Sequence, residues 1–264
     1  QVSSGSYKRP FSIAGPAANW AAEATARSET TAPTLQELAF PAHELYAMPA
    51  ASQTLLEDSA VDIDRWLAGE IEVAFAEKES AAFVSGDGSD RPRGFASYPK
   101  VSEAGWIWGT LGFVPTGAVG GFPASDAQAG VSAADPLIDL VYTLKAGYRQ
   151  NATFVMNKKT QAAVRKLKDA DGNHLWQPPA SPGAQASLLN FPVVENEEME
   201  DVADDAHPIA FGDFRRGYLI VDRAGIRILR DPYSAKPYVL FYTTKRVGGG
   251  VQDFEAIKFL KLSS

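Results

Sequence analysis

Apolar residues recur at intervals of three and four from residue 61 to residue 83, and this spacing predicts an amphipathic helix over that range. At 1.5 Å per residue, the helix would be roughly 33 Å long. It ends at SGDGSDRPRG, because the glycines and the proline do not continue a helix. The expected buried stripe of this helix consists of Ile63, Trp66, Leu67, Ile71, Ala74 and Phe75, while charged residues occupy the other faces.

Two shorter helices with a strand between them are expected in the middle of the chain. The segment SAADPLIDLVYTLKAGY predicts a helix with Asp135 at the N-cap and Pro136 in the first turn. NATFVMN predicts a short buried strand, and NKKTQAAVRKLKDADG predicts a helix that is capped by Asn157 and closed by Gly172. The prolines of HLWQPPASPGAQASLL predict a loop after it.

Strand patterns occupy both ends of the chain. Residues 2–14 and 34–46 show strand-like apolar positions, and the last third carries successive strand patterns in IAFGDF, GYLIVD, IRILR, YVLFYTT and FEAIKFLKL. The glycine triplet 248–250 is expected to form a turn between two of these strands. Helices in the first two-thirds and antiparallel strands in the last third predict an α+β fold.

The stretch from residue 19 to residue 45 differs from the rest of the chain. Residues 18–33 carry no sizeable apolar side chain except Trp20, so they cannot bury enough surface to fold unaided. With the strand patterns on either side they form a long two-stranded hairpin, which is marginal in water when isolated. We therefore expect this arm to lie against something outside its own domain.

Composition restricts the partners of the chain. Its formal net charge is −7, so no overall cationic field would hold nucleic acid or an anionic membrane. It contains no cysteine, which excludes disulfides and thiolate metal sites. The sequence contains neither a transmembrane helix pattern nor a signal peptide pattern. Because the first residue is Gln1 rather than Met, we expect a processed product or a fragment.

No pattern predicts catalysis, a metal or a cofactor. His43, His174 and His207 are far apart, and DADGN begins like a calcium loop but has Ala180 where the loop needs a carboxylate. The acidic run ENEEMEDVADD is expected to be a solvated loop. GDGSD and VGGGV match no phosphate-binding pattern, and no nucleophile elbow is present. The expectation is a protein that is not an enzyme; a hydrolase stays an alternative for which no residue set can be named.

Arginines alternate with apolar residues in the strand region near the end of the chain. Solvent-facing sheet edges and contacts between subunits explain this pattern equally well, and both readings stay open for Arg215, Arg216, Arg223, Arg227 and Arg230.

The order and spacing of several segments resemble one family. The long acidic helix runs into FVSGDGSDRPRGFASYP, and then come DPLIDLVYTLKAGYRQNATFVMNKKTQAAVRKLKDADGNHLWQPP and LLNFPVVENEEM. Together these segments resemble the major capsid proteins of tailed bacteriophages of the Hong Kong 97 type, whose shells related gene transfer agents also use. The resemblance covers nearly the whole chain.

The resemblance implies a fold with a long spine helix, an antiparallel sheet, an axial domain and an extended arm called the E-loop. The implied division is an E-loop hairpin in residues 1–46, a peripheral domain with the spine helix in 47–120, an axial domain in 121–214, further peripheral strands in 215–254 and a C-terminal strand in 255–264. It implies a capsomer-axis loop that contains His174 and Trp176. It also implies removal of an N-terminal scaffolding segment, in keeping with a start at Gln1.

The arm between Asn19 and Leu45 matches the E-loop, which lies across a neighbouring subunit. The resemblance therefore implies subunit contacts at Trp20, Glu23, Arg27, Glu29, Arg230, Asp231, Tyr233 and Lys236. Some family members join an E-loop lysine to an asparagine of a neighbour with help from a glutamate. This chain has no lysine between Lys8 and Lys78, and the receiving strand AKPYVLFYTTKR has no asparagine or glutamate. An arginine such as Arg27 stays protonated and is no nucleophile, so we expect a shell without covalent crosslinks.

The implied function is a shell subunit that assembles into pentamers and hexamers and encloses double-stranded DNA in an icosahedral or prolate particle, without specific DNA recognition. Other implied partners are a portal and decoration proteins; no membrane partner is expected. Assembly would take place in the cytoplasm of a bacterial host. The alternative is an encapsulin-like compartment, which shares the fold and holds enzyme cargo. A processed N-terminus favours the capsid, whereas a groove for a cargo peptide would favour the compartment.

Overall fold

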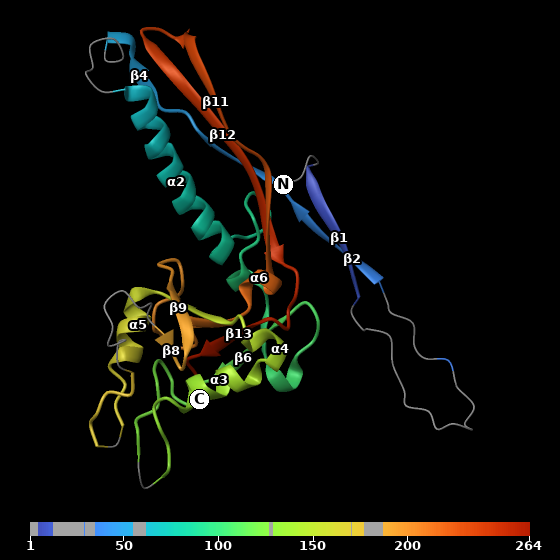
Figure 1. Cartoon of the computed structure of the whole chain (residues 1–264), viewed down its shortest axis with the longest axis vertical. Helices are drawn as coiled ribbons and strands as arrows, with labels where there is room; N and C mark the ends of the chain where they lie inside the picture. Colours follow the sequence, from blue (N-terminus) through green and yellow to red (C-terminus); the bar gives the residue numbers. More distant parts are fainter. Residues whose placement is uncertain are drawn as a thin grey trace.

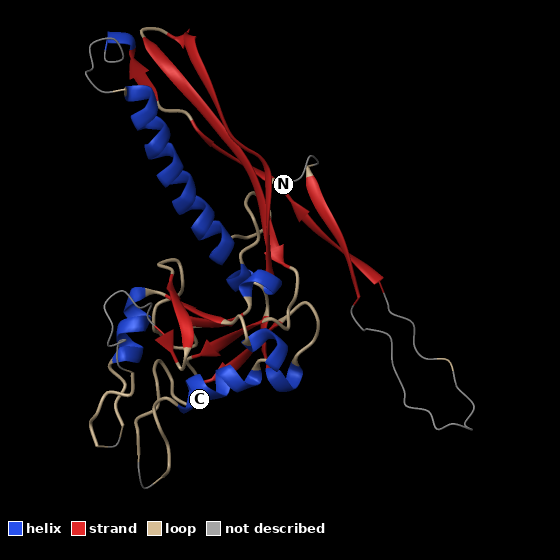
Figure 2. Cartoon of the chain, in the orientation of Figure 1, coloured by secondary structure: helices blue, strands red, loops and turns tan. Residues whose placement is uncertain are grey.

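The computed structural model describes residues 5–12, 29, 35–54, 62–126, 129–169, 171–176 and 187–264. The subunit is elongated (Figure 1): a long helix and a long β-hairpin form one end, a larger sheet with short helices forms the other, and a two-stranded arm projects to one side. Figure 2 shows that strands make up most of the hairpin end and that helices cover the sheet at the opposite end. Helices and sheets thus occur together, as the α+β prediction requires.

The longest helix, α2, spans Ile63–Ser85, which confirms the helix predicted over residues 61–83. Asp62 caps its start, because its carboxylate accepts a hydrogen bond from the Arg65 N–H at 3.1 Å. At the other end the Gly86 N–H donates to the Ala82 carbonyl at 2.9 Å. A Cβ atom at Gly86 would lie 1.9 Å from the Pro92 carbonyl oxygen, so only glycine permits the following loop to pass so close to the helix end.

The hairpin end contains an antiparallel sheet, here called the upper sheet. Its strands are β3 (His43–Ala47), β4 (Ala50–Ser52), β11 (Tyr218–Ala235) and β12 (Tyr238–Val251), with β12 between β11 on one edge and β3 and β4 on the other. The two strand patterns GYLIVD and IRILR form one strand, β11, with a shift of register between Arg223 and Arg227. The turn predicted at Gly248–Gly250 is wrong, because these glycines lie within β12.

One face of α2 packs on the inner face of the upper sheet. Ile71 and Phe75 are buried, as predicted, and Ile63 and Leu67 are partly buried. Leu67 packs against a small cluster of Ala51, Val239 and Phe241 from the sheet. Lys245 of β12 pairs with Glu79 of α2 at 2.5 Å, with both side chains mostly covered.

The predicted burial of Trp66 is wrong, since this side chain is 56% exposed. At 100° per residue, Trp66 lies about 140° around the helix from Ile71 and about 180° from Phe75. It therefore faces away from the sheet. Val73 shares this outer face and is also exposed. Ala74, which the pattern had placed in the buried stripe, is exposed as well.

The opposite end of the subunit is built on a seven-stranded sheet, here called the lower sheet. Its strand order is β5 (Lys100–Ser102), β6 (Leu111–Pro115), β13 (Ile257–Lys261), β10 (Ile209–Gly212), β7 (Thr153–Met156), β9 (Phe191–Glu195) and β8 (Ser187–Leu188). Three of its pairs are parallel: β5 with β6, β6 with β13, and β7 with β9. The sheet is therefore mixed, which the sequence pattern did not predict. β6 pairs with β13 from beyond residue 120, and β5 joins the sheet through β6.

The main hydrophobic core lies in the lower sheet and the helices that cover it. These are α3 (Asp135–Thr143), α4 (Ala146–Arg149), α5 (Lys158–Arg165) and α6 (Phe214–Gly217), with short 3₁₀ turns at Phe95–Ser97 and Glu103–Gly105. Residues that are completely buried include Leu140, Phe154, Met156, Phe211 and Leu260. This core fixes the platform from which the helix, hairpin and arm extend.

Two helix boundaries differ from the predictions. Ala134 rather than Asp135 is the N-cap of α3; Asp135 is the first helical residue, and its carboxylate accepts from the Ser132 N–H at 2.7 Å. Asn157 caps α5 as predicted, by accepting from the Thr160 N–H at 2.7 Å. However, α5 ends at Arg165, and Gly172 has φ +88° in a separate turn.

Phe75 and Trp66 provide a test of the α2 packing. Phe75→Ala should lower the free energy of unfolding of the unassembled subunit by about 3–5 kcal/mol, because it removes a buried ring and leaves a cavity. Trp66→Ala should change it by less than about 1 kcal/mol, because the ring faces solvent. Urea denaturation of both variants measures the difference, and equal losses would contradict the assigned face.

Candidate subunit-contact surfaces

The arm begins with two strands, β1 (Ser6–Ser12) and β2 (Leu35–Pro41), which pair antiparallel from Ser6 opposite Pro41 to Ser12 opposite Leu35. Lys8 and Glu37 form an exposed ion pair across them at 2.7 Å. This confirms the two-stranded start of the predicted hairpin. Trp20, Glu23 and Arg27 lie outside the described residues, and Glu29 is described and exposed.

The root of the arm, which consists of β1 and β2, is attached to the body of its own subunit. The Arg9 Nη1 donates to the Gln252 Oε1 at 2.5 Å, and the Phe11 ring stacks on Trp108 with the ring centres 4.9 Å apart. At the crossing from β2 to β3, the Ala42 N–H donates to the Gly5 carbonyl at 3.0 Å. These contacts fix the direction in which the arm leaves the body.

The glycine triplet of β12 makes room for this root. A Cβ atom at Gly248 would lie 2.3 Å from the Pro41 carbonyl oxygen, and one at Gly250 would lie 3.0 Å from the Phe40 ring. Phe40 is buried, although it belongs to the arm. The chain therefore passes from β2 to β3 directly over Gly248 and Gly250, where β12 has no side chains. Gly249 faces the other side of the strand, where a Cβ atom would lie 2.6 Å from the Tyr218 hydroxyl.

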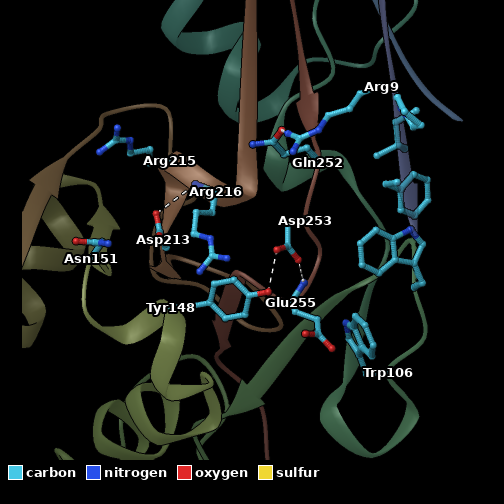
Figure 3. Close-up of a pocket in the computed structure, with 14 residues that line it drawn as sticks. Arg9, Trp106, Tyr148, Asn151, Asp213, Arg215, Arg216, Gln252, Asp253 and Glu255 are labelled. Carbon is cyan, nitrogen blue, oxygen red and sulfur yellow. Dashed lines mark hydrogen bonds between the residues drawn. The ribbon is translucent and has the colours of Figure 1, made fainter. Parts of the chain in front are cut away.

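A cleft of about 900 Å³ separates the arm root from the lower sheet (Figure 3). On the lower side the Tyr148 hydroxyl donates to the Asp253 Oδ2 at 2.8 Å, and the Arg216 guanidinium lies 5.0 Å from the centre of the Tyr148 ring. Burial, followed by the contact with Asp253, raises the pKa of Tyr148 to about 12. Tyr148 therefore keeps its proton at neutral pH and acts as a hydrogen-bond donor that holds the wall of the cleft.

The tip of the β11–β12 hairpin carries the other predicted contact residues. Arg230 lies 3.6 Å from Asp64 of α2, so it ties the hairpin to the helix. Asp231 accepts hydrogen bonds from the Tyr233 and Ser234 N–H groups at 2.9 and 3.2 Å, and these contacts shape the tip. Tyr233 is 80% exposed and Lys236 is also exposed. The outward-facing members of this set are Tyr233 and Lys236.

The outer face of the upper sheet, opposite α2, is largely uncovered. Register places Tyr46, Leu229 and Tyr242 on this face, since they share it with Thr244 and Arg246 and alternate with the buried Phe241 and Thr243. Tyr46 and Leu229 are 66% and 62% exposed. Large apolar side chains in such a row on a sheet face are typical of a surface that meets another chain.

The two residues predicted in a capsomer-axis loop have different environments. Trp176 is 8% exposed, belongs to the main core and donates from Nε1 to the Ser187 carbonyl at 2.6 Å. His174 is exposed, in a turn that bridges back to Lys168. Trp176 therefore stabilises its own subunit and leaves His174 as the accessible member of the pair.

One of the three histidines, His207, lies in an aromatic environment. His207 is packed edge-on to the Phe113 and Phe259 rings, and burial lowers its pKa to about 4, so it is neutral at pH 7. Within the described ranges, no group of three His, Cys, Asp or Glu residues has the geometry to hold a metal ion. None of the described helices is long and apolar enough to cross a membrane.

Comparisons with known proteins place the chain among capsid proteins. A family model for the phage capsid family matches residues 1–262. The capsid of an empty GTA (gene transfer agent) particle, computed with C5 symmetry, is 51% identical, with a TM-score of 0.91 over 100% of this chain and 86% of that chain. Capsid folds at low identity also match: Microbacterium phage Oxtober96 has 14% identity and a TM-score of 0.68, covering 100% and 88% of the two chains. The structure from Mycobacterium phage Adephagia is 15% identical, with a TM-score of 0.64 over 100% of this chain and 87% of that chain. No curated protein matches the sequence.

The glycine crossing leads to a direct prediction. Gly248→Val should push Pro41 away from β12, loosen the arm root and cost about 1–3 kcal/mol of stability through overpacking. Amide hydrogen exchange should become faster in β2 and β3, which the crossing connects. Thr244→Val on the same face of β12 is the matched control and should leave exchange unchanged. Equal exchange in both variants would mean that the crossing does not hold the arm.

Proposed function

The chain belongs to the phage capsid family, and we propose that it is the shell subunit of a gene-transfer-agent or phage particle, assembled from pentamers and hexamers around double-stranded DNA. The observation that carries this proposal is the 51% identity to a GTA capsid over the whole of this chain. The same family assignment favours a capsid over an encapsulin-like compartment.

The exposed surfaces of the subunit support a role in assembly. Among the described residues, Arg9 and Phe11 join the arm to its own body, and the arm projects to one side of that body (Figure 1). The outer faces of α2 and of the upper sheet expose Trp66, Tyr46 and Leu229. In a closed shell every subunit has neighbours, so many such contacts would add up although each is weak. We propose that the arm lies across the neighbouring subunit.

The division into domains is part of this proposal. The upper sheet and α2 would form the peripheral domain, and the lower sheet with its helices would form the axial domain around His174. Because β5 and β6 pair within the lower sheet, we assign Lys100–Pro115 to the axial domain rather than to a peripheral domain that extends to residue 120.

The proposed partners follow from the shell role and from charge. A subunit of net charge −7 would enclose DNA without gripping it, since no overall positive field attracts the phosphates. A portal, decoration proteins and assembly in the cytoplasm of a bacterial host complete the proposal. The subunit would act as a structural protein rather than an enzyme.

Electron microscopy of the purified protein tests the assembly directly. The expected result is closed shells with pentameric and hexameric capsomers after expression of the subunit, with or without its scaffold. A preparation that stays monomeric under all conditions, including mixture with the rest of the particle, would contradict the proposal.

The absence of a crosslinking lysine leads to a second prediction. Shells boiled in SDS without reductant should release subunits of 28.3 kDa, or of larger mass if further residues precede Gln1. The physical reason is that no lysine lies between Lys8 and Lys78, that Lys8 is paired with Glu37 of its own arm, and that guanidinium groups stay protonated. Ladders of pentamer and hexamer mass on the gel would rule this out.

A further inference from the structure

A partly buried lysine lies at the edge of the lower sheet. Lys100 is the first residue of β5, the edge strand. Its Nζ atom donates a hydrogen bond to the Ala96 carbonyl at 2.6 Å and lies 5.1 Å from the centre of the Phe259 ring. Because Phe259 is completely buried, the ammonium group rests on the surface of the hydrophobic core rather than in bulk water.

Lys100 differs from the other lysines of the chain, all of which lie within the described ranges. Most of these form an ion pair with a carboxylate: Lys8, Lys145, Lys158, Lys159, Lys245, Lys258 and Lys261. The others are exposed to solvent: Lys78, Lys166, Lys168 and Lys236. Among the residues that the structure describes, Lys100 is therefore the one partly buried lysine without a carboxylate at ion-pair distance.

The charged groups around Lys100 compensate its ammonium only weakly. Glu200 favours the charged form, but its carboxylate accepts a hydrogen bond from the His207 N–H at 2.6 Å, and Lys261 is paired with Asp205 at 2.9 Å. Burial lowers the pKa of Lys100, and Glu200 offsets this effect only in part. Burial, followed by the Lys100 cation, lowers the pKa of His207 to about 4, so His207 is neutral at pH 7.

A poorly solvated amine is suited to nucleophilic attack, because burial disfavours the ammonium form and leaves more of the amine unprotonated at neutral pH. Acylation fits this position for two further reasons. It converts the cation into a neutral amide, which removes the cost of holding a charge beside the core. The amide also keeps one N–H, which can still donate to the Ala96 carbonyl.

We propose that Lys100 is a site of covalent acylation by acyl phosphates. The Nζ lone pair attacks the acyl carbonyl carbon and a C–N bond forms, while the bond from that carbon to the phosphate oxygen breaks. Phosphate leaves with the electron pair and takes up the proton that the nitrogen loses. The acyl group of such a donor is already activated, so the reaction needs only the free amine. This reactivity belongs to the folded subunit and does not depend on the proposed shell function.

Incubation of the folded subunit with acetyl phosphate at neutral pH tests this site. Mass spectrometry of proteolytic peptides measures the acetylated fraction of each lysine over time. Lys100 should react at least about threefold faster than Lys78, which is exposed and has a larger share of its amine protonated. An equal or slower rate at Lys100 would overturn the proposal, because shielding would then outweigh the gain in free amine.

Unfolding provides the first control. In concentrated urea the advantage of Lys100 over Lys78 should vanish, because it depends on burial beside Phe259. An advantage that persists in the unfolded chain would contradict the proposal, since the local sequence rather than the fold would then cause it.

A charge variant tests the surroundings of the amine. Glu200→Gln removes the charge that favours the ammonium form and keeps an oxygen that accepts from the His207 N–H. Acetylation of Lys100 should become about twofold faster or more in this variant, while the rate at Lys78 stays the same. Glu198→Gln in the same loop is the matched control and should change neither rate. If Glu200→Gln does not accelerate the reaction, the assigned environment of Lys100 is wrong.

The titration of His207 gives a readout that does not depend on acylation. Lys100→Gln has an uncharged side chain, as the acylated lysine does, and should raise the pKa of His207 above the wild-type value of about 4, because the neighbouring cation is gone. Lys100→Arg keeps the charge, should leave that pKa close to the wild-type value and is not acylated. NMR titration of the imidazole measures both. An unchanged pKa in Lys100→Gln would contradict the charge cluster on which the site rests.

Discussion

Strand β12 is the element on which the subunit depends, because it pairs on both edges, packs against α2 on its inner face and is crossed by the arm at one end of its outer face. β11 pairs along one edge and β3 and β4 along the other. On the inner face it meets α2, and on the outer face the arm root crosses it at Gly248. The direction of the arm is thus set by the lack of side chains at a strand that is remote from it in sequence. A steric condition inside the subunit thereby determines the direction in which its arm projects.

Packing in the upper part of the subunit is one-sided, and this has an energetic consequence. α2 buries Ile71 and Phe75 against the sheet but exposes Trp66 and Val73 on the opposite face, and the sheet exposes its own outer row. A buried face on each element is enough to hold the pair together, while the second face keeps its apolar area for a later contact. Tryptophan and tyrosine supply the most contact energy per residue at interfaces. The subunit therefore folds with one set of apolar residues and leaves another set exposed on its surface.

The spacing of apolar residues and the capping residues predicted local structure well. The pairing of distant strands could not be predicted from the sequence. The spacing of apolar residues located α2 to within two residues at each end, and the side chain of Asn157 located the start of α5. The same spacing misplaced Trp66, because a helix with one partner has a narrower buried face than a pattern of threes and fours allows. Two parallel pairs of the lower sheet, β6 with β13 and β7 with β9, join segments far apart in the chain, and nothing local in β6 or β13 indicates its neighbour.

The candidate contact residues also differ in their environments. Tyr233 and Lys236 were identified through the family resemblance and are exposed, whereas Trp176 proved to be a core residue. The bulge in β11 was not predicted, because GYLIVD and IRILR look like two strands, whereas they form one strand with Gly225 at φ +63° between them. Reversible contacts also bear on how a shell without a crosslinking lysine would stay closed. Guanidinium and carboxylate groups form a contact that is specific in geometry yet reversible. A misplaced subunit can therefore leave, and once the shell is closed the many contacts of each subunit act together and make departure rare.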